Sequence, residues 1–62
     1  SISAYVLSKR MEAAKNMLKF SPHSYAEIAA MLAFSSQSHF TRVFKVQTGY
    51  TPKAYQNRFY RR

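Results

Sequence analysis

Residues that start or stop helices divide this chain of 62 residues into short segments. Ser21-Pro22 ends the first segment, because the residue before a proline is steered away from helical backbone angles. Ser24 and Glu27 have the spacing of a capping box, in which each side chain accepts a hydrogen bond from the other residue's amide. Thr51-Pro52 opens the last segment with an N-cap and a proline at the first helical position. These signals predict an all-α chain of about four short helices without strands.

The predicted helices fit one domain over residues 1–62. A long helix is expected at 3–20, with Ser3 as its N-cap and an apolar stripe at the 4-3-4 spacing of a helix face. Residues 24–48 are expected to form a short helix, a tight turn and a second helix that stops at Gly49, which is the outline of a helix-turn-helix. A last helix is expected at 51–60, so the fold class is a helix-turn-helix on a homeodomain-like three-helix core.

The charge of the chain is unusually one-sided. Ten Lys and Arg stand against two acidic residues, Glu12 and Glu27, which gives a net charge of +8 and a pI of about 10.3. Such an excess indicates a polyanionic partner, either nucleic acid or an anionic membrane surface, although it also serves solubility. No apolar run is long enough to span a membrane, so no transmembrane helix is expected. We expect no membrane partner, with a membrane-surface module kept as the alternative. The chain has no cysteine, which fits a cytoplasmic setting.

The stretch FSSQSHFTRVFK at residues 34–45 combines an apolar and a polar helix face. At about 100° per residue, Phe40, Val43 and Phe44 gather on one side. The opposite side and its flanks carry six polar side chains without an acid: Gln37, Ser38, His39, Thr41, Arg42 and Lys45. A solvated helix face would show the same pattern. Together with the charge and the preceding short helix, however, the pattern favours contact with DNA.

The chemistry of this polar face suits the major groove of DNA. Arg42 can donate two hydrogen bonds to guanine, Gln37 can pair with adenine, and Ser or Thr hydroxyls can bond to any base edge. Lys45 lies one turn further along and is placed for a phosphate. The sequence therefore predicts a recognition helix around residues 36–46, with either Ser35 or Ser36 as its N-cap.

Other chemistries lack the residues they need. No His, Asp or Glu stands at metal-ligand spacing from His39, and no acid is placed to orient His39 as a base for a serine nucleophile. Glu12 and Glu27 lie on different predicted helices, which excludes a paired-carboxylate hydrolase. We therefore expect no enzyme, no metal and no cofactor.

The stretch EIAAMLAFSSQSHFTRVFKVQTGYTPKAYQNRF, from Glu27 to Phe59, resembles the C-terminal DNA-binding region of AraC/XylS-family transcription regulators. The positions that carry the resemblance are Ile28-Ala29, Phe34 to Phe40, Arg42, Phe44-Lys45, Gly49, Thr51-Pro52 and Tyr55. Upstream, YVLSKRMEAAKNML is similar to the linker helix that joins the two helix-turn-helix units of such proteins. Ala4-Tyr5 echoes Ala54-Tyr55, so we expect a fragment of a larger regulator: linker helix plus second unit.

The resemblance implies sequence-specific binding of double-stranded DNA in a bacterial transcription regulator. It assigns base contacts to Gln37, Ser38, Thr41, Arg42 and His39, and phosphate contacts to Lys45, Ser24, Tyr25 and Lys53. RNA polymerase is a further expected partner. Any effector or dimer partner would bind parts outside this chain. The alternative readings are a basic amphipathic module for membrane surfaces and a protein-interaction module.

One position departs from the family pattern. Family members usually have glycine before the Phe of the FSSQSHF segment, where this chain has Ala33. If the turn needs a positive φ, alanine costs on the order of 1 kcal/mol there. The alternative is that Ala33 adopts an ordinary helical conformation.

Overall fold

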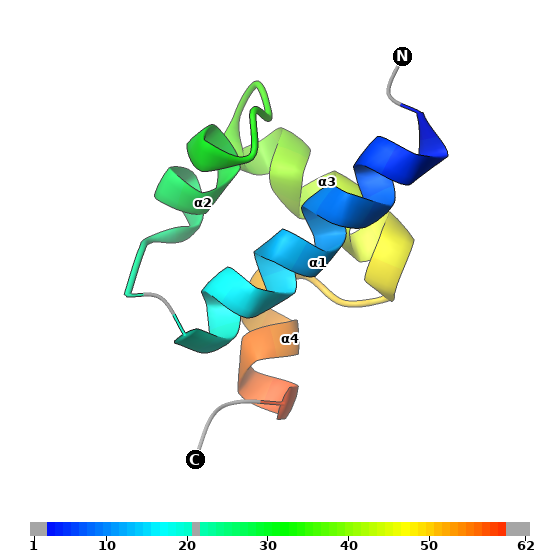
Figure 1. Ribbon diagram of the computed structural model, residues 1–62. Coiled ribbons are helices and arrows are strands. Elements are labelled where there is room, and N and C mark those ends of the chain that lie inside the picture. The colour runs from blue at the N-terminus through cyan, green and yellow to red at the C-terminus, as the bar shows by residue number, and fades with distance from the viewer. Residues whose placement is uncertain (1–2, 21, 60–62) are drawn as a thin grey trace.

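The computed structural model describes residues 3–20 and 22–59, which form four helices and no strand. They are α1 (Ala4–Phe20), α2 (Tyr25–Met31), α3 (Gln37–Thr48) and α4 (Pro52–Phe59) (Figure 1). The predicted all-α class is confirmed. The recognition helix was predicted at 36–46 and runs about half a turn further, to Thr48. The last residue of the helix predicted at 51–60 lies outside the described residues.

The helix starts follow the capping residues of the sequence. Ser3 Oγ accepts from the Val6 amide at 3.2 Å, and Thr51 Oγ1 accepts from the Ala54 amide at 3.1 Å. At α2, the capping box is complete: Ser24 Oγ accepts from the Glu27 amide at 3.1 Å, and Glu27 Oε1 accepts from the Ser24 amide at 2.8 Å. These bonds satisfy amides that have no partner inside their own helices.

One hydrophobic core joins the helices. α3 contacts α2 and α4, and α1 contacts α4. The ribbon of α1 crosses that of α3 in Figure 1. Eight residues are buried in the core: Met11, Ala14, Leu18, Ile28, Ala29, Phe34, Phe40 and Phe44. Since Phe40 and Phe44 are both 0% exposed, they fix which side of α3 faces inward.

Two hydrogen bonds, both made by the Gln56 side chain, join α1, α2 and α4. The Tyr25 hydroxyl donates to Gln56 Oε1 at 2.7 Å, and Gln56 Nε2 donates to the Leu18 carbonyl oxygen at 2.8 Å. The Leu18 carbonyl belongs to the last turn of α1, where carbonyls lack partners within the helix. Gln56 therefore holds the start of α2 and the end of α1 against α4.

Ala33 lies in the turn between α2 and α3, where its backbone conformation can be compared with the two alternatives. Its φ is 64°, so the alanine adopts the left-handed conformation and not a helical one. The Ala33 amide donates to the Ala30 carbonyl at 3.1 Å, and the Phe34 amide donates to the Ala29 carbonyl at 2.9 Å. This pair of bonds is the Schellman motif, which commonly has glycine at the left-handed position.

Candidate nucleic-acid interface

The orientation of α3 is set at its start and along its inner face. Ser36, and not Ser35, is the N-cap: its Oγ accepts from the His39 amide at 3.0 Å. Phe40 packs against Phe34 with ring centroids 5.4 Å apart, and Phe44 packs against Tyr55 at the same centroid distance. Because these rings anchor the inner face to the preceding turn and to α4, the polar face has to point outward.

The polar face of α3 forms one wall of a shallow hollow. The hollow is lined by Gln37, Ser38, Thr41, Arg42, Lys45 and Thr51. Thr41 is half-buried, and the other four side chains from α3 are exposed. The structure thus brings together four of the five predicted base contacts and one predicted phosphate contact. We call these six residues the α3 hollow.

Thr51 is the lining residue that the sequence did not assign to the site. It was predicted only as the N-cap of α4, and its Oγ1 does accept from the Ala54 amide. The hydroxyl keeps its own proton, which it can donate to a ligand in the hollow. No sequence signal places Thr51 beside Thr41, because the packing of α4 against α3 brings them together.

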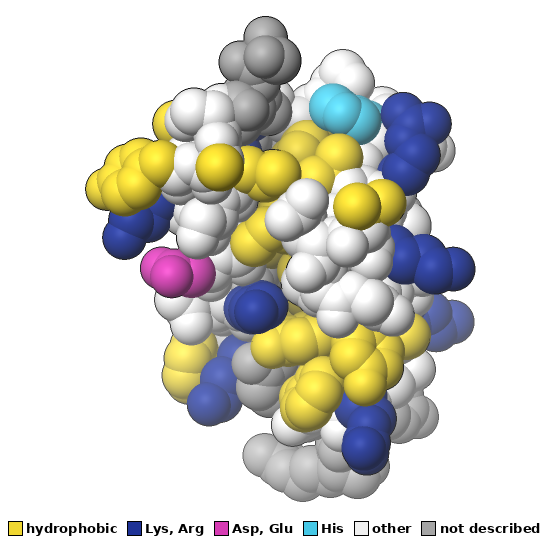
Figure 2. Space-filling view, turned by 90° about the vertical axis from the view of Figure 1, so that its right-hand side faces the viewer, with side chains coloured by type: hydrophobic (Ala, Val, Ile, Leu, Met, Phe, Trp, Pro, Cys, Tyr) yellow, Lys and Arg dark blue, Asp and Glu magenta, His cyan; other side chains and the backbone are white. Residues whose placement is uncertain are grey.

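The charge of the α3 hollow is entirely positive. Arg42 and Lys45 line it, and neither acidic residue of the chain does. Figure 2 shows a row of Lys and Arg side chains along the right-hand edge of the molecule, with an acidic side chain on the opposite side. A polyanion approaching the hollow meets no carboxylate among the lining side chains.

His39 lies apart from the hollow, although it was predicted to contact bases. Its ring is half-buried, and its Nδ1 lies 3.1 Å from Ser35 Oγ. The ring also packs edge-on against Phe34, with centroids 5.4 Å apart and an interplanar angle of 81°. These two contacts hold the imidazole over the turn that precedes α3.

Two of the predicted phosphate contacts, Ser24 and Tyr25, lie at the start of α2. The Tyr25 hydroxyl already donates its proton to Gln56, so it has none left for a phosphate oxygen. Beside them, the Glu27 carboxylate accepts from the Ser24 amide and lies 3.5 Å from His23 Nδ1. The Ser24 backbone hydrogen bond, followed by the charge of His23, lowers the pKa of Glu27. A phosphate here would therefore meet an ionised carboxylate.

The remaining predicted phosphate contact, Lys53, is exposed in the first turn of α4. It follows Thr51, a residue of the α3 hollow, by two residues. No acidic residue lies in the first turn of α4. The geometry leaves Lys53 available to an anion.

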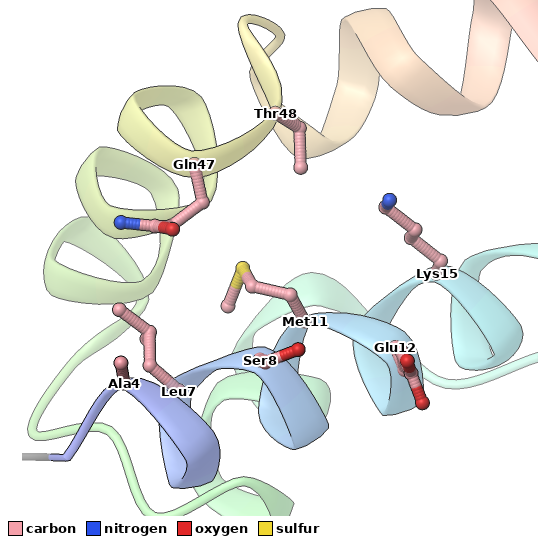
Figure 3. Close-up of a pocket in the computed structure, with 8 residues that line it drawn as sticks. All are labelled: Ala4, Leu7, Ser8, Met11, Glu12, Lys15, Gln47 and Thr48. Atoms are coloured by element: carbon pink, nitrogen blue, oxygen red, sulfur yellow. The ribbon is translucent and has the colours of Figure 1, made fainter.

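A second hollow lies on another side of α3 and has a different character. Gln47 and Thr48 face α1 across it (Figure 3), and α1 contributes Ala4, Leu7, Ser8, Met11, Glu12 and Lys15. Thr48 is occupied, since its Oγ1 donates to the Phe44 carbonyl at 2.8 Å. Glu12 and Lys15 give this hollow one charge of each sign, so it lacks the purely positive lining of the α3 hollow. The α3 hollow is therefore the candidate interface.

Neither a metal site nor a membrane-spanning helix is found among the described residues, 3–20 and 22–59. Within these ranges, no three His, Asp or Glu side chains are grouped so that they could hold a metal ion. None of the helices described here has the length and apolar character needed to cross a membrane.

Comparison with known proteins identifies the family of this chain. A family model described as a helix-turn-helix domain matches residues 1–58. The HTH-type transcriptional activator RhaR of Yersinia pseudotuberculosis serotype O:1b (strain IP 31758) is 39% identical over 61 residues, which are 98% of this chain and 21% of that protein. The chain belongs to the AraC family.

Two other relatives of this AraC-family domain are also named as regulators. RhaR of Yersinia pestis bv. Antiqua (strain Angola) is likewise 39% identical over 98% of this chain and 21% of its own length. The F1 operon positive regulatory protein of Yersinia pestis is 38% identical over 89% of this chain and 18% of its own length. The chain spans about a fifth of the length of these relatives. No solved structure matches it.

Membership of the AraC family confirms two predictions from the sequence, the helix-turn-helix fold and a role in DNA binding and transcription regulation. The family comprises DNA-binding domains of transcription regulators and is not an enzyme class.

Proposed function

We propose that this AraC-family domain binds double-stranded DNA sequence-specifically, with α3 in the major groove and α2 across the phosphate backbone. The observation that carries the proposal is the two-sided construction of α3. Phe40 and Phe44 are fully buried on one side, and the α3 hollow presents only polar and cationic α3 side chains on the other. A helix of this kind is fixed in orientation before DNA arrives, so little ordering is needed on binding.

The roles within the hollow follow from side-chain chemistry. Arg42 matches the two acceptors of guanine, Gln37 matches adenine, and Ser38 and Thr41 bond to any base edge. Lys45 carries a point charge suited to a phosphate, and Lys53 supplies another on α4. Ser24 and the backbone at Tyr25 are proposed to lie near the phosphate backbone, as the start of α2 does in helix-turn-helix proteins. The ionised Glu27 carboxylate beside them makes this contact weaker than those of Lys45 and Lys53.

A binding-site selection with the 62-residue chain tests the proposal, followed by titration of the selected duplex and of random duplexes. Arg42→Ala is expected to cost about 1–3 kcal/mol on the selected duplex and little on random DNA. Lys45→Ala should weaken binding to both alike and reduce the salt slope by about 1. Equal losses for Arg42→Ala on both duplexes would overturn its role as a base contact.

Lys9→Ala is the matched control. Lys9 is exposed on α1, within reach of the Tyr5 ring, with 5.5 Å from Nζ to the ring centroid. The variant removes one positive charge, as Lys45→Ala does, but outside the α3 hollow. It should change the affinity less than Lys45→Ala. A single unit lacks the avidity of two linked sites, so we expect weak, strongly salt-dependent binding.

The membrane-surface alternative is not favoured. A lipid-binding amphipathic helix needs a free apolar stripe, whereas the stripe of α1, formed by Met11, Ala14 and Leu18, is buried in the core. Circular dichroism in buffer without vesicles should show the full helix content.

Family membership also carries proposals about the wider setting. We place the protein in the cytoplasm, without catalytic activity, with RNA polymerase as a further partner and with any effector or dimer partner bound outside this chain. In vitro transcription from a promoter that carries the selected duplex, with and without the regulator, tests the polymerase proposal. The outcome also shows whether the protein activates or represses.

A further inference from the structure

We propose that His39 contacts a phosphate at the edge of the major groove and does not read a base, and that Ser35 is its positioning residue. The proposal rests on the proposed DNA-binding function of α3. It assigns His39 a role different from that of the other polar side chains of the helix.

His39 lies on a flank of α3 outside the α3 hollow. At about 100° per residue, His39 and Gln37 lie on opposite flanks of Ser38. The α3 hollow extends from the Gln37 flank to Thr51, and His39 does not line it. A helix in the major groove lies between two phosphate backbones, so a side chain on a flank can reach a phosphate. The Gln37 flank belongs to the hollow with the proposed base contacts, whereas the His39 flank does not. His39 therefore occupies the flank away from α4.

The His39 ring is directed toward Ser35, at the start of α3. Its Nδ1 lies 3.1 Å from Ser35 Oγ, four residues earlier, so the side chain turns back toward the start of α3. The half-buried ring lies edge-on to Phe34, which is itself only 7% exposed. Held by a hydrogen bond and a ring contact, the imidazole stays close to the helix and does not extend toward the groove floor.

The His39 nitrogen that does not face Ser35 is Nε2. When Ser35 donates its hydroxyl proton to Nδ1, the neutral imidazole carries its own proton on Nε2. An Nε2–H group is a donor, and phosphate oxygens only accept. The opposite tautomer would present a lone pair to the phosphate and is disfavoured beside it. The Ser35 hydroxyl, which can donate as well as accept, is compatible with the tautomer that a phosphate requires.

The surroundings of the ring add positive charge on the same side. The Arg10 guanidinium of α1 lies over the Phe34 ring, 5.6 Å from its centroid, and the same ring contacts His39. The amino end of α3 carries the positive end of the helix dipole. Both favour an anion beside the turn.

The experiment compares variants of the 62-residue chain on two duplexes of equal length, the selected one and a random one. His39→Ala should weaken binding to both by the same factor, about 10- to 100-fold, the size of a hydrogen bond to a charged group. Arg42→Ala is the contrasting control, with a loss confined to the selected duplex. A His39→Ala loss confined to the selected duplex, with a changed base preference, would overturn the proposal.

Ser35 is tested through its dependence on His39. Ser35→Ala should weaken binding about 2- to 3-fold, a fraction of the hydrogen bond that it helps to aim, and should have no further effect in the His39→Ala background. Ser35→Thr keeps the hydroxyl and should restore binding. A Ser35→Ala loss that persists in the His39→Ala background would show a merely structural role and overturn the positioning claim.

Neutral methylphosphonates, substituted one at a time in the selected duplex, locate the contact. Wild type should lose affinity at one position where His39→Ala loses none. His39→Gln, which retains an amide donor, guards against misfolding of the alanine variant and should bind better than it. If no methylphosphonate position separates wild type from His39→Ala, the phosphate contact is wrong although DNA binding stands. If wild type binds neither duplex, the proposed function itself fails.

Discussion

Two helices of this domain, α2 and α3, end at a residue with positive φ, but only one of these residues is a glycine. Ala33 follows α2 with a φ of 64°, and Gly49 follows α3 with a φ of 85°. A residue with a Cβ atom pays about 1–2 kcal/mol in this conformation, whereas glycine adopts it freely. The turn after α3 therefore follows local backbone preference, and the turn inside the helix-turn-helix opposes it.

Packing explains how the Ala33 turn persists. Two backbone hydrogen bonds close it, and the next residue, Phe34, is buried against Phe40. Burying a phenylalanine contributes about 1.5–3 kcal/mol, which exceeds the strain at Ala33. The Gly49 turn has one such bond, from the Gly49 amide to the Lys45 carbonyl at 2.8 Å. Tertiary contacts therefore stabilise the turn at Ala33, whereas the backbone preference of glycine stabilises the turn at Gly49.

The largest expected effect is that of Phe34→Ala, because it removes the side chain that holds the strained turn. The loss should be about 3–5 kcal/mol, which is close to the whole stability expected of a chain this short. Urea titration followed by circular dichroism measures it, with Phe34→Leu as a milder variant that stays folded.

The matched control is Tyr50→Ala, at the equivalent position after Gly49. Tyr50 is half-buried and contacts Phe59 with ring centroids 5.6 Å apart. Its loss should be less than half that of Phe34→Ala. Equal losses at the two positions would remove the distinction between the turns.

Gly49→Ala should destabilise the domain by about 1 kcal/mol through the backbone alone. A Cβ atom built at Gly49 has no atom within 4 Å, so steric overlap does not contribute. The same urea titration measures the change in the free energy of unfolding. A much larger loss would show that packing, and not φ, controls this turn.

Ala33→Gly is the mirror of that change and should stabilise the domain by up to about 1 kcal/mol. Relief of the left-handed strain exceeds the extra entropy that glycine gives the unfolded chain. Ala30→Gly, within α2, is the matched control and should destabilise by about 1 kcal/mol. If Ala33→Gly also destabilised the domain, the strain at Ala33 would be absent.

The smallest effect concerns the starts of the same two helices. The α2 capping box contains Glu27, whose pKa lies below its ordinary value of 4.5, whereas α3 has only the Ser36 hydroxyl as its cap. A lowered folded pKa means that the stabilisation is present above pH 4.5 and is lost as the pH falls through the folded pKa. The free energy of unfolding should differ more between about pH 6 and about pH 3 in wild type than in Glu27→Gln. Glu12→Gln, which leaves the capping box intact, should behave like wild type, and an unchanged pH response in Glu27→Gln would contradict the assignment.

The sequence predicted the local features of the fold closely. Ser24 and Glu27 form the capping box, Thr51 caps α4, and Gly49 ends α3, because each of these bonds joins residues three or four apart. It left open the cap of α3 and the φ of Ala33. The structure selects Ser36 and a positive φ, since both depend on where Phe34 enters the core.

Contacts between distant residues were beyond the reach of the sequence. Nothing in the pattern indicated that Gln56 would accept the Tyr25 proton and reach the Leu18 carbonyl. The phosphate contact of Tyr25 was implied by the family resemblance alone and stays a prediction. The placement of Thr51 in the α3 hollow depends in the same way on how α4 packs against α3.

By itself, the sequence determined that this protein is a set of short capped helices with a basic, polar face on the third, because charge, capping and periodicity are properties of neighbouring residues. The tertiary structure decided which polar side chains form the α3 hollow and which side chains are held elsewhere. It turned His39 toward Ser35 and engaged the Tyr25 hydroxyl with Gln56. These choices depend on the packing of the phenylalanine core, which joins residues far apart in the chain.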